Sequence, residues 1–146
     1  MSDVAWEIEH SVETSASPAF AWTYMSNVEN WDDPPAQFKL DGPFATGSRG
    51  ATHMPGQEPL HWTLREVSPP DSYTIEGQLD RAVMLVQWQF SGLPDGRTLL
   101  KQHILLEGEN AAAYLPGVAE AFTANLAPGM ERIAAAIGQA ELLHGT

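Results

Sequence analysis

The sequence predicts an α+β domain in which a curved antiparallel sheet packs against one long C-terminal helix. Three observations indicate this class: a strictly alternating strand at residues 4–13, six short strand-like segments joined by turns between 37 and 108, and an alanine-rich helical tail at 111–143. Short strands joined by tight turns are typical of an antiparallel meander. A sheet with one apolar face must bury that face against a second layer, and the tail helix can provide it.

The N-terminal strand is followed by two short helices. In the strand, Trp6, Ile8, His10 and Val12 alternate with polar residues, so a histidine stands in the apolar row. Ser17 can cap the next helix, and Pro18 suits its first position. A second short helix is expected near Asn27–Trp31, because the two prolines that follow cannot continue it.

The helical tail has apolar residues at three- and four-residue steps, from Leu115 to Ile137. Pro128–Gly129 lies within this pattern and predicts a kink. The chain shows no internal repeat or linker, and its 146 residues suit one domain, residues 1–146.

The hairpin turns assign the strand residues to two faces, because side chains alternate along a strand. The expected inner face carries large rings and few polar groups: Trp6, His10, Thr52, Trp62, Leu64, Tyr73, Ile75, Trp88, Phe90, Leu100, Gln102 and Ile104. Folding Met54 against Leu60 places His53 opposite His61 on the outer face. The inner side chains either fill the core completely or leave an apolar cavity with a few polar groups, which is the usual character of a small-molecule site.

Composition excludes several classes of partner. The chain has 19 acidic and 7 basic residues, a net charge of −12 and no cysteine. Nucleic acid and anionic membranes are therefore not expected as partners, because both require clustered Lys and Arg. Disulfides and thiolate metal sites are excluded. No signal peptide or apolar run of spanning length is seen, so the expected location is the cytoplasm.

Four segments resemble a known superfamily: ETSASPAFAWTYMSNVENWDDP, HWTLREVSPPDSYTIEG, TLLKQHILLEGENA and APGMERIAAAIGQAE. In this order they resemble the START-like superfamily, also called SRPBCC or Bet v 1-like, and within it the polyketide cyclase/dehydrase-like proteins of bacteria. The resemblance implies a helix-grip fold, in which seven strands wrap around the C-terminal helix and leave a hydrophobic cavity. Members bind lipids, sterols, polyketides or plant hormones, and some catalyse cyclisation or dehydration. They share no catalytic motif, so no catalytic residue is assigned.

The candidate ligand-binding residues combine the inner face with the helices: Trp6, His10, Tyr24, Trp62, Tyr73, Trp88, Gln102 and Phe122. His10 could act as a general base, contact a ligand or be structural. Gln102 is an amide in an apolar row and must find partners in a ligand, an indole N–H or water.

Other polar groups are weaker candidates. His53 and His61 could share a metal with Glu58, but two solvated histidines are the simpler interpretation, so no metal and no cofactor are expected. Asp32 and Asp33 are placed near the cavity mouth, where they end a helix and face water. On the outer face, Val83, Leu85, Leu99 and Leu105 are expected to form an apolar patch that could support a homodimer.

Three functions remain open. The first is binding of a small hydrophobic or aromatic molecule in the cavity. The second is an aromatase/cyclase or dehydratase that uses the same cavity, with His10 moving a proton. The third is an interaction module that works through the outer sheet, with a filled interior.

Overall fold

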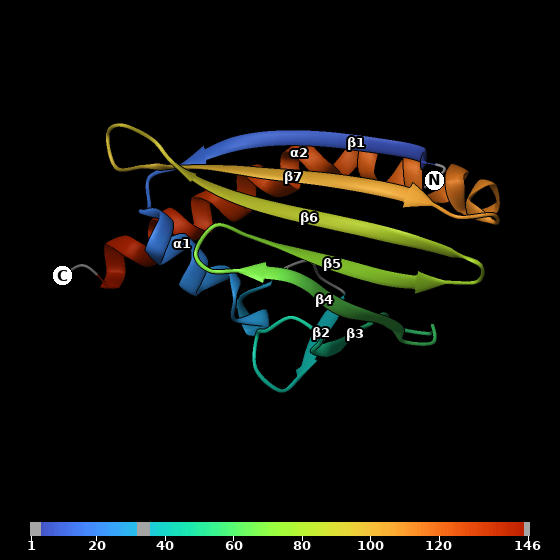
Figure 1. The fold of residues 1–146 in the computed structure, drawn as a ribbon. Helices are drawn as coiled ribbons and strands as arrows, with labels where there is room; N and C mark the ends of the chain where they lie inside the picture. Colours follow the sequence, from blue (N-terminus) through green and yellow to red (C-terminus); the bar gives the residue numbers. More distant parts are fainter. Residues whose placement is uncertain (1–3, 32–35, 145–146) are drawn as a thin grey trace.

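The structure is a computed structural model that describes residues 4–31 and 36–144. It has the predicted α+β architecture, drawn in Figure 1. The elements in chain order are β1 (Val4–Thr14), α1 (Pro18–Met25), the 3-10 helix η1 (Val28–Asn30), β2 (Gln37–Asp41), β3 (Arg49–His53), β4 (Leu60–Ser68), β5 (Ser72–Leu79), β6 (Ala82–Gly92), β7 (Thr98–Glu107) and α2 (Ala111–His144). Asp32 and Asp33 lie outside the described residues.

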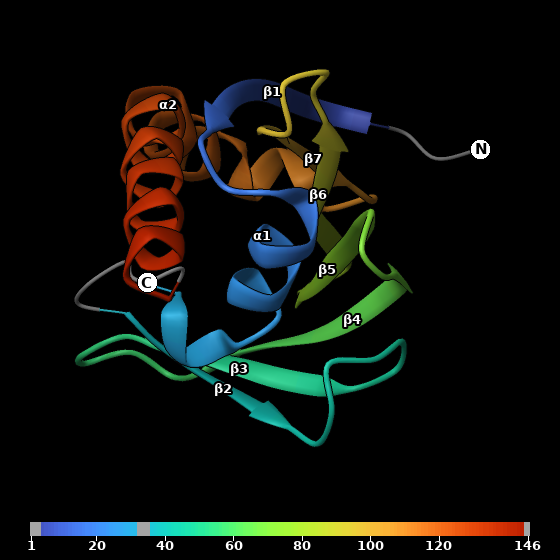
Figure 2. The same ribbon diagram turned by 90° about the vertical axis from the view of Figure 1, so that its left-hand side faces the viewer.

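The seven strands form one antiparallel sheet in the order β1-β7-β6-β5-β4-β3-β2. The first and last strands pair with each other, so β1 forms one edge of the sheet and β2 forms the other. Figure 2 shows the sheet curving from β1 at the top to β2 at the bottom, with α1 and α2 on its concave side. The predicted helix-grip arrangement is confirmed.

The two short helices occupy the predicted positions. The Ser17 hydroxyl accepts a hydrogen bond from the Phe20 backbone N–H at 3.2 Å, and Pro18 takes the first position of α1. Such capping satisfies one of the free N–H groups at a helix start. The second short helix is a single 3-10 turn, which leaves Trp31 at its C-cap.

The C-terminal helix α2 is one element of 34 residues. It contains Pro116 as well as the expected Pro128, and each proline removes one helical hydrogen bond. Figure 2 shows its orange first part and red last part running in different directions, so the helix bends across the concave side of the sheet.

The predicted faces of the sheet are confirmed. Trp62, Tyr73, Trp88, Leu100 and Ile104 are all buried on the inner face. The core joins them to Leu126, Met130 and Ile137 of α2. Tyr73 pairs with Trp88, and Trp88 pairs with Gln102, as the hairpin turns predict.

The predicted pairing of His53 with His61 is wrong. The β3–β4 ladder pairs Thr52 with Leu60, so His61 lies opposite Ala51, and His53 lies opposite Gln37 of β2. The loop is longer than the turn that was assumed, and the register shifts by two residues. A shift of two keeps each side chain on its face but changes its neighbours, so the shared metal position does not form.

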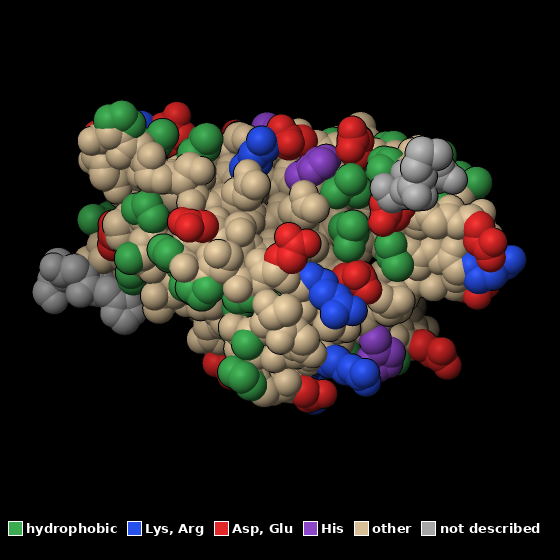
Figure 3. Space-filling view, viewed as in Figure 1, with side chains coloured by type: hydrophobic (Ala, Val, Ile, Leu, Met, Phe, Trp, Pro, Cys, Tyr) green, Lys and Arg blue, Asp and Glu red, His purple; other side chains and the backbone are tan. Residues whose placement is uncertain are grey.

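The expected apolar patch on the outer face is divided. Leu85 pairs with Leu105, but Leu99 lies six residues along β7, with Lys101 and His103 between them on the same face. His103 lies between Gln87 and Glu7, at 3.2 Å from each, and Lys101 is 3.4 Å from Glu9. Figure 3 shows acidic, basic and histidine side chains spread over this face. The patch that suggested a homodimer is therefore interrupted by charge.

Among the described residues, no helix is both long and apolar enough to span a membrane.

Candidate ligand-binding cavity

A cavity of about 570 Å³ lies between the inner face of the sheet and the middle of α2. Its lining comes from the end of α1, from η1 and its C-cap, from β2, β5, β6 and β7, and from α2: Met25, Asn30, Trp31, Phe38, Tyr73, Ile75, Val86, Trp88, Gln102, Ala121, Phe122, Asn125, Leu126, Gly129, Met130, Arg132 and Ile133. Most of these side chains are aromatic or aliphatic. A volume in the range of roughly 300–1,000 Å³ with a mostly apolar lining is typical of small-molecule sites.

Stacked rings form one wall of the cavity. The ring of Tyr73 lies between those of Trp31 and Trp88, with centroid separations of 6.4 and 6.5 Å and interplanar angles of 8° and 21°. Offset-stacked rings are a favourable arrangement for aromatic side chains. The Trp31 indole N–H donates to the Met25 carbonyl at 2.7 Å, which fixes its orientation. The wall therefore presents fixed aromatic surface.

The hydroxyl of Tyr73 is buried and has no hydrogen-bond partner among the described residues. The side chain is 1% exposed, and its burial raises the pKa of the phenol far above its usual value near 10. Desolvation has this effect because it disfavours the charged phenolate. Tyr73 is therefore a neutral phenol at physiological pH, with an unused donor and acceptor.

Gln102 supplies a polar group in the middle of the apolar wall. It stands between His10 of β1 and Trp88 of β6 in the paired rows of the sheet. The side chain is half-buried and forms no hydrogen bond with any other described residue. Its amide can therefore donate to and accept from a molecule in the cavity.

The mouth of the cavity lies along one stripe of α2. Ala121, Asn125 and Arg132 line the cavity and are also exposed to solvent. Residues spaced by four and seven lie on the same face of a helix. Asn30 of η1 faces this stripe across the opening, and its amide nitrogen donates to the Tyr24 carbonyl at 2.9 Å.

Four of the eight expected residues line this cavity: Tyr73, Trp88, Gln102 and Phe122. Trp6 lies behind Phe122, with ring centroids 6.4 Å apart. Tyr24 is half-buried on α1 and packs against the core instead of lining the cavity. The parity of the strands explains the inner placement of these residues, and contacts between distant segments decide which of them reach the open space.

Trp62 is on the inner face but is covered. Its indole lies across Gly50, where a Cβ would be 2.2 Å from the ring, and its N–H donates to the Thr52 hydroxyl at 3.0 Å. Trp31 packs against it at 5.6 Å and takes its place in the cavity wall. Trp31 was not among the expected lining residues, although it lies in one of the segments that resemble the superfamily.

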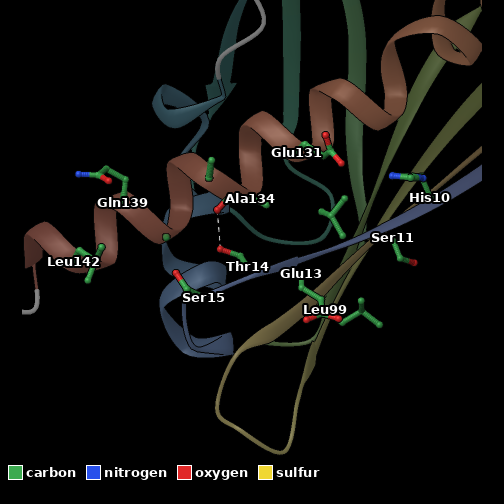
Figure 4. A pocket seen from close by; sticks show the side chains of 13 residues that line it. His10, Ser11, Glu13, Thr14, Ser15, Leu99, Glu131, Ala134, Gln139 and Leu142 are labelled. Carbon is green, nitrogen blue, oxygen red and sulfur yellow. Dashed lines mark hydrogen bonds between the residues drawn. The ribbon is translucent and has the colours of Figure 1, made fainter.

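His10 lines a second and separate hollow, a groove of about 770 Å³ between β1 and α2. Figure 4 shows this groove, with His10 and Glu131 toward one end and Gln139 and Leu142 at the other. The Thr14 hydroxyl crosses it to donate to the Ala134 carbonyl at 2.7 Å. Its lining includes the carboxylates of Glu13 and Glu131 and, unlike that of the inner cavity, contains no Phe, Trp or Tyr side chain among the described residues. Aromatic side chains are typical of small-molecule sites.

Within residues 4–31 and 36–144, no group of three or more His, Cys, Asp or Glu side chains is arranged to hold a metal ion. His53 and His61 thus have no third ligand there.

The seven-stranded sheet, the long helix across its concave side and the apolar cavity between them form a helix-grip domain, and the matching family model identifies it as a member of the START-like superfamily. The chain belongs to the family described as polyketide cyclase / dehydrase and lipid transport, which matches residues 5–138. No curated protein matches the chain.

Solved structures share the fold at low sequence identity. A norcoclaurine synthase from Thalictrum flavum is 13% identical with a TM-score of 0.72, and the match covers 100% of this chain and 99% of that one. A protein from Arthrobacter aurescens is 17% identical with a TM-score of 0.71, covering 95% and 91%. The di-domain ARO/CYC StfQ of the steffimycin pathway is 15% identical with a TM-score of 0.71, covering 93% of this chain and 51% of that one.

Proposed function

We propose that this protein binds a small, mostly apolar or aromatic organic molecule in the cavity between the sheet and α2. The observation that carries the proposal is the cavity of about 570 Å³ with its wall of stacked rings and its unpaired Gln102 amide. Burial of apolar surface supplies most of the binding free energy in such sites, and a few polar groups set the orientation.

The polar groups near the wall favour a ligand that can form hydrogen bonds. Gln102 lines the cavity with its amide free, and Tyr73, another lining residue, has a buried hydroxyl without a partner among the described residues. An unpaired buried hydroxyl costs free energy, and a ligand oxygen that reaches it recovers part of that cost. One norcoclaurine synthase structure holds dopamine and hydroxybenzaldehyde, so this fold accommodates substituted single rings in at least that protein.

The charges around the cavity favour binding over acid–base catalysis. Among the described lining residues, the ionisable groups are Tyr73 and Arg132. Efficient general acids and bases have pKa values near the operating pH, whereas the pKa of Tyr73 is raised by burial and arginine stays protonated. His10, the proton carrier expected for a cyclase, lines the other groove. A carrier or sensor role therefore fits this lining better than a cyclase or dehydratase.

Filling the cavity tests the proposal. Val86 of β6 points into the cavity, and Val83 of the same strand points to the outer face, so Val86→Phe and Val83→Phe add the same bulk on opposite sides. The probe is N-phenyl-1-naphthylamine, a neutral dye whose fluorescence rises in apolar surroundings. We expect V86F to weaken binding by at least about tenfold, which is on the order of 1.4 kcal/mol, and V83F to bind like the unchanged protein.

If V86F is folded and binds the dye as tightly as the unchanged protein does, the dye does not occupy the cavity and the proposal is contradicted. Native mass spectrometry of the purified protein provides a second measurement, in which a co-purified small molecule should be present in V83F and lost in V86F.

A further inference from the structure

We propose that the ligand of this cavity carries an acidic group, such as a carboxylate, sulfonate or phosphate, on its apolar body, and that Arg132 receives this group at the mouth. This inference rests on the proposed function and specifies the chemical class of the ligand. It is argued from the charge of the lining, the position of the guanidinium and its lack of a partner.

The charge of the lining is opposite to that of the protein. The chain has 19 acidic and 7 basic residues, yet none of the described residues that line the cavity is acidic. Arg132 carries the one formal charge among them, and Tyr73 stays neutral because burial raises its pKa. Among the described lining residues, a cationic ligand would meet a positive charge and no carboxylate, whereas an anionic ligand meets a complementary group.

The guanidinium of Arg132 lies back along α2 toward the cavity. One of its terminal nitrogens is 3.8 Å from the point where a Cβ on Gly129 would stand, and Gly129 also lines the cavity. Because Gly129 has no side chain, the space beside the guanidinium stays open. The guanidinium of Arg132 therefore lies over the mouth of the cavity, on the same face of α2 as Asn125. Its aliphatic carbons run along the helix.

Arg132 has no anionic partner in the described part of the chain. Arg65, Arg81 and Arg97 each have a carboxylate oxygen within 4.0 Å, and Arg132 has none. The nearby amides are already engaged, since Asn30 donates to the Tyr24 carbonyl and Asn125 to the Ala121 carbonyl, at 2.9 and 2.8 Å. Among the described residues at the mouth, Arg132 supplies the charged donor, and its planar guanidinium matches the geometry of a carboxylate or phosphate.

A matched pair of dyes tests the acidic group. The dye 8-anilino-1-naphthalenesulfonate has the same aromatic body as N-phenyl-1-naphthylamine and adds one sulfonate. The variants are Arg132→Gln and, as a control, Arg49→Gln, which removes the same charge from the outer face, where Arg49 has no ion pair with another described residue. Circular dichroism and the melting temperature verify that each variant is folded.

We expect R132Q to weaken binding of the sulfonated dye about three- to tenfold more than binding of the neutral dye, because only the sulfonated dye has a charge for Arg132 to pair with. R49Q should change neither affinity. The loss in R132Q should shrink in 1 M salt, where charges more than a few ångströms apart are screened.

The remaining outcomes separate the two proposals. If R132Q binds both dyes as the unchanged protein does, the acidic-group inference is wrong while the proposed cavity function stands. If R49Q weakens the sulfonated dye as much as R132Q does, the effect is one of total charge and the inference is again wrong. If neither dye binds the unchanged protein, the proposed function and the inference both fail.

Discussion

At the scale of single residues, Tyr73 carries a buried hydroxyl that forms no hydrogen bond with the described residues. Its ring packs between Trp31 and Trp88. Removing a hydroxyl that makes no hydrogen bond abolishes a desolvation cost without losing a contact. Because Tyr73→Phe keeps the ring and removes only the hydroxyl, this variant isolates the effect of the hydroxyl.

The alkaline stability of the protein should depend on this residue. Burial raises the pKa of Tyr73 above its unfolded value near 10, so the folded state keeps a proton that the unfolded state loses. The contribution of Tyr73 to the free energy of unfolding is fully present below about pH 10. Above that pH it falls by up to about 1.4 kcal/mol per pH unit. We expect Tyr73→Phe to shift the midpoint of alkaline unfolding upward, as measured by circular dichroism.

The same variant should be at least as stable as the unchanged protein at pH 7. A lower melting temperature at neutral pH would show that the hydroxyl does have a partner in solution. In that case the wall would not offer an unused polar group to a ligand.

At the scale of elements, glycines mark where segments approach closely and where they do not. In the β3–β4 hairpin, the Trp62 indole occupies the space beside Gly50, and a Cβ there would lie 2.2 Å from the ring. In α2, Gly117 is exposed and has nothing within 4 Å of the corresponding point. The first glycine is required by packing, and the second is not.

These two positions should respond in opposite directions to the same substitution. Gly117→Ala should stabilise the protein by roughly 0.5–1 kcal/mol, because alanine loses less backbone entropy in a helix. Gly50→Ala should destabilise it by at least about 1–3 kcal/mol, because the buried indole must move from its bond to Thr52. Urea unfolding followed by fluorescence measures both, and a stabilising Gly50→Ala would contradict the described position of Trp62.

At the scale of the whole molecule, we expect that the outer face of the sheet does not pair with a second copy. Its apolar side chains are separated by Lys101 and His103, and the chain carries a net charge of −12. Like charges on two copies repel, and stable dimer interfaces are usually continuous and apolar.

We therefore expect a monomer of 15.9 kDa by light scattering at low and moderate salt. A mass twice as large would support the homodimer hypothesis that was based on the apolar residues of β6 and β7. In that event, Leu85→Lys, at the centre of the Leu85–Leu105 pair, should return the mass to that of the monomer.

Local patterns in the sequence predicted most of the architecture. Strict alternation in β1, the Ser17–Pro18 helix start and the parity of the hairpins depend on neighbours a few residues apart. For the same reason, the inner placement of Tyr73, Trp88 and Gln102 was correct. The register of β3 with β4 was not, because it depends on the conformation of the whole loop.

The sequence by itself determined which side chains face the concave side of the sheet, because side-chain parity is a local property of each strand. Only the tertiary structure decided which of them line open space. Trp31 covers Trp62, and Arg132 reaches the mouth beside Gly129, since η1 and α2 are brought against the sheet from distant parts of the chain. A cavity is the space that packing leaves between elements, so its lining depends on contacts that no short segment contains.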